Sequence, residues 1–119
     1  MVSTLTPQYR IAHVGINHPN GESALETAQK LCDVFGLAPY GETATHIFSG
    51  SLFELKKNST KGTVGHIAMQ TDDIEMALEH LKKKGVGIRT DSIKRNSNGK
   101  IRFVYLELEI AGFAFHLTL

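Results

Sequence analysis

Cysteine, net charge and long apolar segments are all scarce in this sequence. The single cysteine excludes an internal disulfide. A net charge of +1 argues against a nucleic-acid or membrane partner, because such partners normally need a concentrated basic surface. No apolar run reaches the roughly 18 residues of a membrane span, and residues 1–7 lack the features of a secretory signal. We therefore expect a cytoplasmic protein.

Size and composition indicate one globular domain. The 119 residues are 41% hydrophobic and 21% charged, which is ordinary for a protein with a single core. Cys32 falls on the apolar stripe of an expected helix, so it is interpreted as a small buried hydrophobe rather than as a catalytic thiol, the less favoured alternative. We expect residues 1–119 to form one domain.

An internal repeat is the strongest signal in the sequence. Residues 13–16 and 66–69 share a pattern that begins with histidine, at an offset of 53 positions. Further along, residues 50–55 match residues 112–117 at an offset of 62. Self-similarity of this kind indicates a structural unit used twice. We assign module one to about residues 9–57 and module two to about residues 63–119.

Hydrophobic periodicity gives each module the order β-α-β-β-β. Both helices are expected to begin at capping boxes, Ser23 with Glu26 and Asp72 with Glu75. The expected elements are strands 9–17, 38–42, 46–49 and 52–56 with helix 23–35, then strands 64–70, 87–94, 101–108 and 113–119 with a helix that starts at 72 and ends at Gly85. The predicted fold class is α+β, with two small sheets set side by side around a concave face.

Four ionisable residues are predicted to meet in that concavity. Strand alternation places His13, Glu54, His66 and His116 opposite the large apolar residues that should pack on the helices. Three imidazoles and one carboxylate suit a divalent cation such as Zn²⁺, Ni²⁺, Fe²⁺, Co²⁺ or Mn²⁺. A histidine on a strand is more often a hydrogen-bonded structural residue, but the coincidence at matched positions of the repeat favours a metal or polar-ligand site.

Other polar residues are weaker candidates. His18, His46 and His80 have no metal-ligating partner in the repeat, so they are left out of the predicted site. Asn17 and Gln70 each lie four residues beyond a ligand histidine, where they can bind substrate or satisfy the rim of the site. Tyr105 and Glu107 share a strand face and are further candidates to supply a phenol and a carboxylate.

The duplicated unit resembles the vicinal oxygen chelate superfamily, which includes glyoxalase I, extradiol dioxygenases and the fosfomycin and bleomycin resistance proteins. The most telling segments are residues 65–68 before the second helix and residues 112–117 at the end of the chain. The resemblance covers about residues 9–119. It implies the glyoxalase-like fold, a metal held by the four residues above, a small-molecule substrate and a homodimer.

A finer resemblance involves residues 31–37 and 109–113. These segments look like the small glyoxalase-type domain associated with bacterial aldolases that cleave 2-keto-3-deoxy-6-phosphogluconate or 4-hydroxy-2-oxoglutarate. The aldolase activity itself belongs to a separate barrel that a chain of this length cannot contain.

The resemblance implies two classes of function. One is a glyoxalase-like metal-dependent lyase or isomerase that acts on a small α-keto, hydroxy or enediol substrate, with Glu54 or a metal-bound hydroxide as the base. The alternative is a non-catalytic module that binds a sugar acid or similar metabolite beside an aldolase. Glyoxalase I-like enzymes carry a carboxylate at the fourth ligand position, whereas this chain has His116 there.

Overall fold

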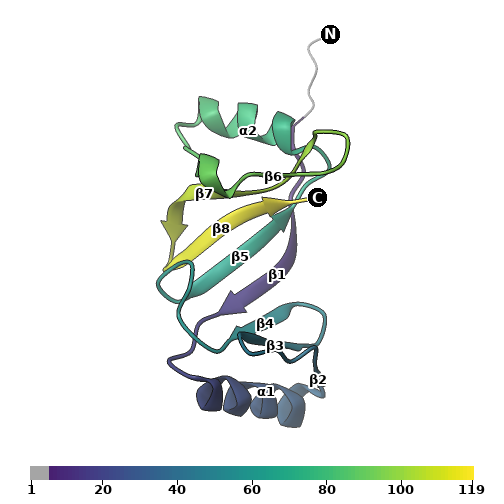
Figure 1. Cartoon of the computed structure of the whole chain (residues 1–119), viewed down its shortest axis with the longest axis vertical. Helices are drawn as coiled ribbons and strands as arrows, with labels where there is room; N and C mark the ends of the chain where they lie inside the picture. The colour runs from purple at the N-terminus through teal and green to yellow at the C-terminus, as the bar shows by residue number, and fades with distance from the viewer. Residues whose placement is uncertain (1–5) are drawn as a thin grey trace.

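The computed structural model describes residues 6–119, and within them the β-α-β-β-β order occurs twice (Figure 1). Module one contains β1 (Arg10–Ile16), α1 (Gly21–Phe35), β2 (Pro39–Tyr40), β3 (His46–Ser49) and β4 (Phe53–Lys56). Module two contains β5 (Gly65–Gln70), α2 (Ile74–Lys83), the short 3-10 helix η1 (Thr90–Ser92), β6 (Lys94–Arg95), β7 (Ile101–Ile110) and β8 (Phe113–Thr118). The predicted fold class is confirmed.

The strands form one continuous sheet rather than the two small sheets that we expected. Its order is β2-β3-β4-β1-β5-β8-β7-β6, so each half repeats the same internal arrangement. The halves join where β1 pairs antiparallel with β5, while β1 and β5 pair in parallel with β4 and β8 of their own modules. Pairing of β1 with β5 satisfies backbone groups that would otherwise be unpaired at two sheet edges. That pairing is the reason why the expectation was wrong.

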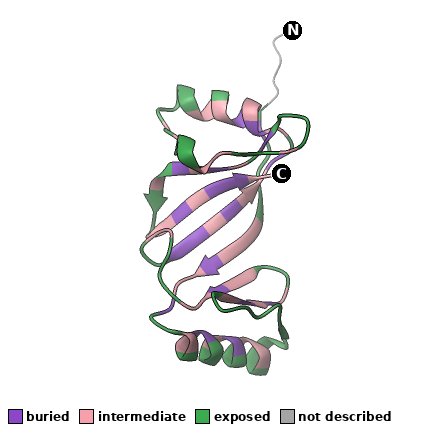
Figure 2. Cartoon of the chain, viewed as in Figure 1, coloured by how far each residue is buried: buried purple, intermediate pink, exposed green. Residues whose placement is uncertain are grey.

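Each helix packs against its own end of the sheet and forms a separate core. Figure 1 shows α1 and α2 at opposite ends of the long axis, with β1 and β5 between them. In Figure 2, the buried positions of α1 face the sheet and the exposed ones face away from it. The buried side chains are Ala24, Ala28, Ile47 and Leu55 around α1, and Ile74, Ala77, Ile101, Val104, Leu106 and Leu117 around α2.

On β4 and β8, the burial of alternate residues against the helices determines which side chains point away from the helices. Leu55 on β4 and Leu117 on β8 pack beneath the helices and are almost completely buried. Successive side chains on a strand alternate between the faces of the sheet, so Glu54 and His116 point to the opposite, helix-free face. The hydrophobic cores thereby position the ionisable residues.

Some local expectations were wrong. The N-cap of α1 is Asn20, whose Oδ1 accepts a hydrogen bond from Ser23 N at 2.9 Å, and the N-cap of α2 is Asp73, one residue beyond the expected one. In both helices the side chain of the residue directly before the first turn accepts a hydrogen bond from a free amide of that turn. Residues 87–94 form a single bridge at Ile88 followed by η1 instead of a continuous strand.

No helix in the described part of the chain is long and apolar enough to cross a membrane.

Candidate metal centre

The candidate centre lies where the two modules join, and the register of β1 with β5 positions the first two of its predicted ligands. Gly15 pairs with His66, and His13 pairs with Ala68. Each histidine therefore faces a small residue on the neighbouring strand. The two pairs flank the Val14–Ile67 pair of this antiparallel ladder, so the same arrangement occurs twice about the join.

Gly15 is required by the position of the His66 ring. A Cβ atom added at Gly15 would overlap the His66 imidazole. His66 is almost fully buried, and the overlapping atoms belong to its ring rather than to a flexible chain end. The close approach of ring and backbone explains why glycine occupies this position of the strand.

The closing strand of each module adds one further ionisable residue to the same face. Glu54 on β4 pairs with Gly15, and His116 on β8 pairs with Ala68. The Glu54–Gly15–His66 row and the His13–Ala68–His116 row are thus neighbours in the sheet. In each module the first strand pairs in parallel with the last strand, so the two rows form in the same way.

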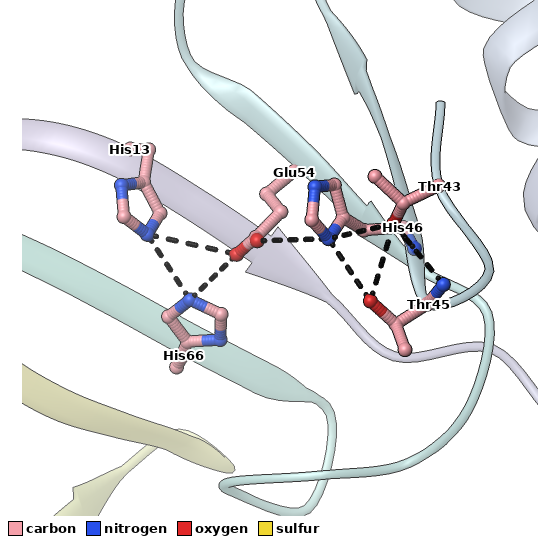
Figure 3. A network of polar contacts seen from close by, with 6 residues as sticks. All are labelled: His13, Thr43, Thr45, His46, Glu54 and His66. Carbon is pink, nitrogen blue, oxygen red and sulfur yellow. Dashed lines mark hydrogen bonds and ion pairs between the residues drawn. The ribbon is translucent and has the colours of Figure 1, made fainter. Parts of the chain in front are cut away.

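The side chains of His13, Glu54 and His66 converge tightly (Figure 3), and His116 approaches the other two histidines. His66 Nε2 lies 3.1 Å from Glu54 Oε1 and 3.1 Å from His13 Nε2, and His13 Nε2 lies 3.7 Å from Glu54 Oε1. The ligand nitrogens of His13, His66 and His116 all lie within 4.8 Å of one another. The structure therefore brings together the residues that the repeat selected.

The protonation states suit a cation. A hydrogen bond from His66 holds the pKa of Glu54 below its usual value, against the opposing effect of burial. Burial lowers the pKa of His13, and burial together with the charges of His13 and His66 lowers the pKa of His116 to about 4. At neutral pH the group offers an ionised carboxylate at Glu54 and neutral imidazoles at His13 and His116, the forms that bind metal.

Within the described part of the chain, two ring nitrogens of the clustered histidines are buried without a hydrogen-bond partner. The Nδ1 atoms of His66 and His116 are buried, and no hydrogen-bond partner for either is found among residues 6–119. Buried polar atoms without a partner are few in folded proteins. In His66 the other ring nitrogen, Nε2, faces Glu54 and His13, so a cation held among these residues would bind Nε2 and leave Nδ1 as it is. The donor set and its burial fit a borderline divalent cation.

His46 belongs to the site although the sequence analysis left it out. Its Nδ1 atom lies 3.8 Å from Glu54 Oε2 and within 3.4 Å of the Thr43 and Thr45 hydroxyls (Figure 3). The exclusion relied on the repeat, and His46 has no equivalent in module two. The register of the β3–β4 hairpin, where Phe48 pairs with Glu54, was the signal that would have placed His46 on the same face.

His18 has a structural role. It is buried, its Nδ1 lies 2.9 Å from the backbone oxygen of Lys56, and its Nε2 lies 2.8 Å from Thr27 Oγ1. These contacts tie α1 to β4. Both ring nitrogens are thereby occupied away from the metal centre, in agreement with the exclusion of this residue.

Asn17 and Gln70 are placed differently from each other. The Asn17 side-chain amide donates to the backbone oxygens of Lys61 and Gly62 at 3.4 and 3.2 Å, so it holds the connection between the modules. Gln70 follows His66 and Ala68 on the same face of β5, where it pairs with Thr118 on β8. Gln70 thus shares a strand face with His66, whereas the Asn17 side chain is used within the protein.

Aromatic rings form the module-two end of the site. The ring centroids of Phe103 and Tyr105 lie 4.4 and 5.0 Å from that of His116. Burial and the charge of Glu54 raise the pKa of Tyr105 to about 12, so its phenol stays protonated at neutral pH. Glu107 lies within a register irregularity of β7, between Tyr105 and Glu109, and is exposed. The structure brings the predicted phenol to the site without the second carboxylate.

No family model and no curated protein sequence matches this chain. Solved structures do match it. A variant of the Streptomyces coelicolor methylmalonyl-CoA epimerase in complex with 2-nitronate-propionyl-CoA has 20% identity and a TM-score of 0.58, with 91% of this chain and 92% of the epimerase covered. The Mycobacterium tuberculosis methylmalonyl-CoA epimerase has 15% identity and a TM-score of 0.60, with 99% and 91% covered.

A hypothetical protein from Bacillus halodurans C-125 is similar to the same degree, with 17% identity, a TM-score of 0.60, and 93% and 94% of the two chains covered. Matches over nine-tenths of both chains show that the whole domain, and not one module alone, has this arrangement. The fold is the glyoxalase-like fold of the vicinal oxygen chelate proteins, as the resemblance implied.

Proposed function

We propose that this chain is a metal-dependent isomerase that moves a proton on a small substrate, at a carbon next to a carbonyl group with a vicinal oxygen. The observation that carries the proposal is the convergence of three imidazoles and one carboxylate, with 3.1 Å between His66 Nε2 and both Glu54 Oε1 and His13 Nε2. Fold alone does not determine function, so the proposal depends on this geometry.

His13, Glu54, His66 and His116 would hold the metal. A divalent cation of the Zn²⁺, Ni²⁺, Fe²⁺, Co²⁺ or Mn²⁺ class acts as a Lewis acid that polarises a carbonyl oxygen. The four side chains come from β1, β4, β5 and β8, so both modules are needed to complete the site. Side chains fixed on paired strands also hold their positions better than loop residues do.

Glu54 is the residue assigned to proton transfer. Its Oε1 atom faces His13 and His66, while Oε2 is directed toward His46 (Figure 3). An ionised carboxylate accepts the proton as the C–H bond breaks and returns it to the same or the neighbouring carbon, so no proton is gained or lost overall. The protonated phenol of Tyr105, beside His116, can donate a hydrogen bond to a substrate oxygen.

The similar structures favour isomerisation over a lyase reaction. Two of the proteins described above are methylmalonyl-CoA epimerases, and one was solved with 2-nitronate-propionyl-CoA. An epimerase removes and returns a proton at one carbon, which needs an acid–base group and a stabilised carbonyl oxygen. At 15–20% identity the likeness supports the reaction class and leaves the substrate open.

Hydrogen exchange tests the proposal directly. The metal-loaded protein would be incubated in D₂O with methylmalonyl-CoA, methylglyoxal–thiol adducts and 2-keto-3-deoxy acids, and deuterium incorporation would be followed by NMR. We expect metal-dependent exchange with at least one carbonyl compound, lost in Glu54→Gln and kept in His80→Ala. Exchange that is equal with and without metal, or equal in wild type and Glu54→Gln, would overturn the proposal.

One observation favours a non-catalytic alternative. Among residues 6–119, Glu54 is the one carboxylate found in an ion pair with the clustered histidines, and the fourth ligand position holds His116. A module of this kind would bind a sugar acid or similar metabolite beside an aldolase without turning it over. Saturable binding of a 2-keto-3-deoxy acid, together with no exchange and no turnover of any compound in the panel, is the result that would select this alternative.

Assembly into a homodimer remains a prediction, and sedimentation velocity of the purified chain measures it.

A further inference from the structure

Two adjoining hollows lie beside the module-two end of the metal centre. The larger has a volume of about 660 Å³ and the smaller about 360 Å³. Both are lined by Lys61, Arg89, Asp91 and Tyr105. Tyr105 also contacts His116, so the two hollows lie next to the proposed metal ligands. A substrate held at the metal centre has room to extend in this direction.

Positive charge is concentrated around the smaller hollow. Its lining includes Lys61, Arg89 and Lys94, against one carboxylate, that of Asp91. Within the described residues, neither lysine forms an ion pair with a carboxylate. The Arg89–Asp91 contact is 3.6 Å long and joins two largely exposed side chains, so it competes weakly with a ligand.

The two lysines are held against the aromatic rings that border the metal centre. Lys61 Nζ lies 5.4 Å from the centroid of the Tyr105 ring, and Lys94 Nζ lies 4.8 Å from that of Phe103. Both rings also contact His116. Cation–π contacts of this kind restrain long, flexible side chains. Each ammonium group is therefore one ring away from a proposed metal ligand.

The larger hollow is less suited to an anion. Glu107 and Glu109 line it in addition to Asp91. Glu109 Oε1 accepts hydrogen bonds from the Thr63 hydroxyl and backbone amide at 2.9 and 3.4 Å, which fixes a negative charge on that side. The balance of charge thus directs an anionic group toward Phe103 and Lys94 and away from Glu109.

We infer that the smaller hollow binds an anionic group, a phosphate or a second carboxylate, at the end of the substrate opposite the reacting carbon. The inference rests on the proposed function for the claim that this ligand is the substrate. Lys61, Arg89 and Lys94 hold the anion, and the Phe103 and Tyr105 rings line the path between it and the metal ligands. The substrate class narrows to carbonyl compounds with a terminal phosphate or carboxylate.

The test uses the metal-free protein, with inorganic phosphate and succinate as probes and amide NMR shifts as the measurement. We expect one of the two anions to bind saturably and to shift the amides around Arg89 and Lys94. Which anion binds more tightly identifies the phosphate or the carboxylate class. Replacing both Lys61 and Lys94 by Met keeps the apolar stems and should weaken that binding roughly tenfold or more.

A matched double variant, Lys30→Met with Lys100→Met, removes the same charge away from the hollow and should bind as the wild type does. The amide spectrum of each variant verifies its fold. Equal affinity in the wild type and the Lys61/Lys94 variant, or shifts confined to other regions, would overturn the inference. Metal titration is independent of this measurement, so a chain that binds phosphate here but no metal would refute the proposed function and leave the anion site intact.

Discussion

The two modules place different residues at equivalent positions, and this difference defines the chemistry of the site. Glu54 closes module one and His116 closes module two, and each pairs with a small residue on the first strand of its own module. The backbone arrangement is the same in both cases. The repeat therefore positions the predicted ligand residues, whereas the identity of the side chain determines whether the position carries a negative charge.

The surroundings of the two residues differ as much as the residues themselves. Glu54 is next to His46, with the Thr43 and Thr45 hydroxyls behind it, while His116 lies against the Phe103 and Tyr105 rings. Polar neighbours favour an ionised carboxylate, and apolar burial favours a neutral imidazole. One end of the site is thus polar and anionic, and the other is aromatic and neutral.

Removal of the negative charge from module one should have the largest effect on metal affinity. Glu54→Gln keeps the size of the side chain and removes the only anionic ligand, so we expect metal affinity to fall more than about a hundredfold. His116→Gln should cost less, because it exchanges one neutral donor for another. Isothermal titration with Zn²⁺ compares the two variants, and equal losses would contradict the unequal roles assigned to them.

Insertion of a methyl group at the join should disturb both modules together. Gly15→Ala forces the His66 ring out of position, and overpacking of this kind costs about 1–3 kcal/mol. We expect a lower free energy of unfolding and weaker metal binding in the same variant. Gly21→Ala, at the start of α1, is the matched control and has only the Lys57 side chain nearby. Wild-type metal binding by Gly15→Ala would show that the ring has free space.

The buried imidazole of module two should make the metal-free protein sensitive to moderate acid. His116 has a folded pKa of about 4 and an unfolded pKa of about 6.5, so the unfolded chain binds more protons between these values. Stability is therefore lost as the pH falls through this window, by about 2 kcal/mol between pH 7 and pH 5. Urea unfolding at pH 7 and at pH 5 measures this loss of stability. An equal loss of stability in His116→Phe would refute its assignment to His116.

Replacement of His46, the polar neighbour of Glu54, should have the smallest effect on metal affinity. His46→Phe removes a ring nitrogen 3.8 Å from Glu54 Oε2 and leaves the four proposed ligands in place. Outer partners of this kind orient a ligand, so metal affinity should fall by about tenfold. His80→Phe on α2 provides the control. A loss as large as that of Glu54→Gln would mean that His46 is itself a ligand.

The sequence was sufficient to predict what the repeat encodes. The offsets of 53 and 62 identified His13 with His66 and Glu54 with His116, and alternation placed all four on one face. The continuous sheet could not be predicted in the same way, since the pairing of β1 with β5 joins strands that are far apart in the sequence. Neither did the periodicity of residues 87–94 distinguish a strand from the bridge and 3-10 turn that form there.

His46 shows where reasoning from a repeat fails. The residue acts in one module only, so the criterion that selected the other histidines excluded it. Hairpin register would have placed it on the site face, but its contact with Glu54 depends on the tertiary arrangement of both side chains. The basic residues around the smaller hollow were missed for a related reason, because Lys61 comes from the linker while Arg89 and Lys94 come from the segments around η1.

Metal stoichiometry is the most direct test of the account. Metal-free protein would be titrated with Zn²⁺, and the bound metal would be verified by elemental analysis. We expect one cation per chain in the wild type and in His80→Ala. We expect almost none in His66→Ala, because His66 Nε2 lies 3.1 Å from both Glu54 Oε1 and His13 Nε2. Equal affinity in the wild type and His66→Ala, or no bound cation in the wild type, would contradict the central claim that the two modules together form a metal site.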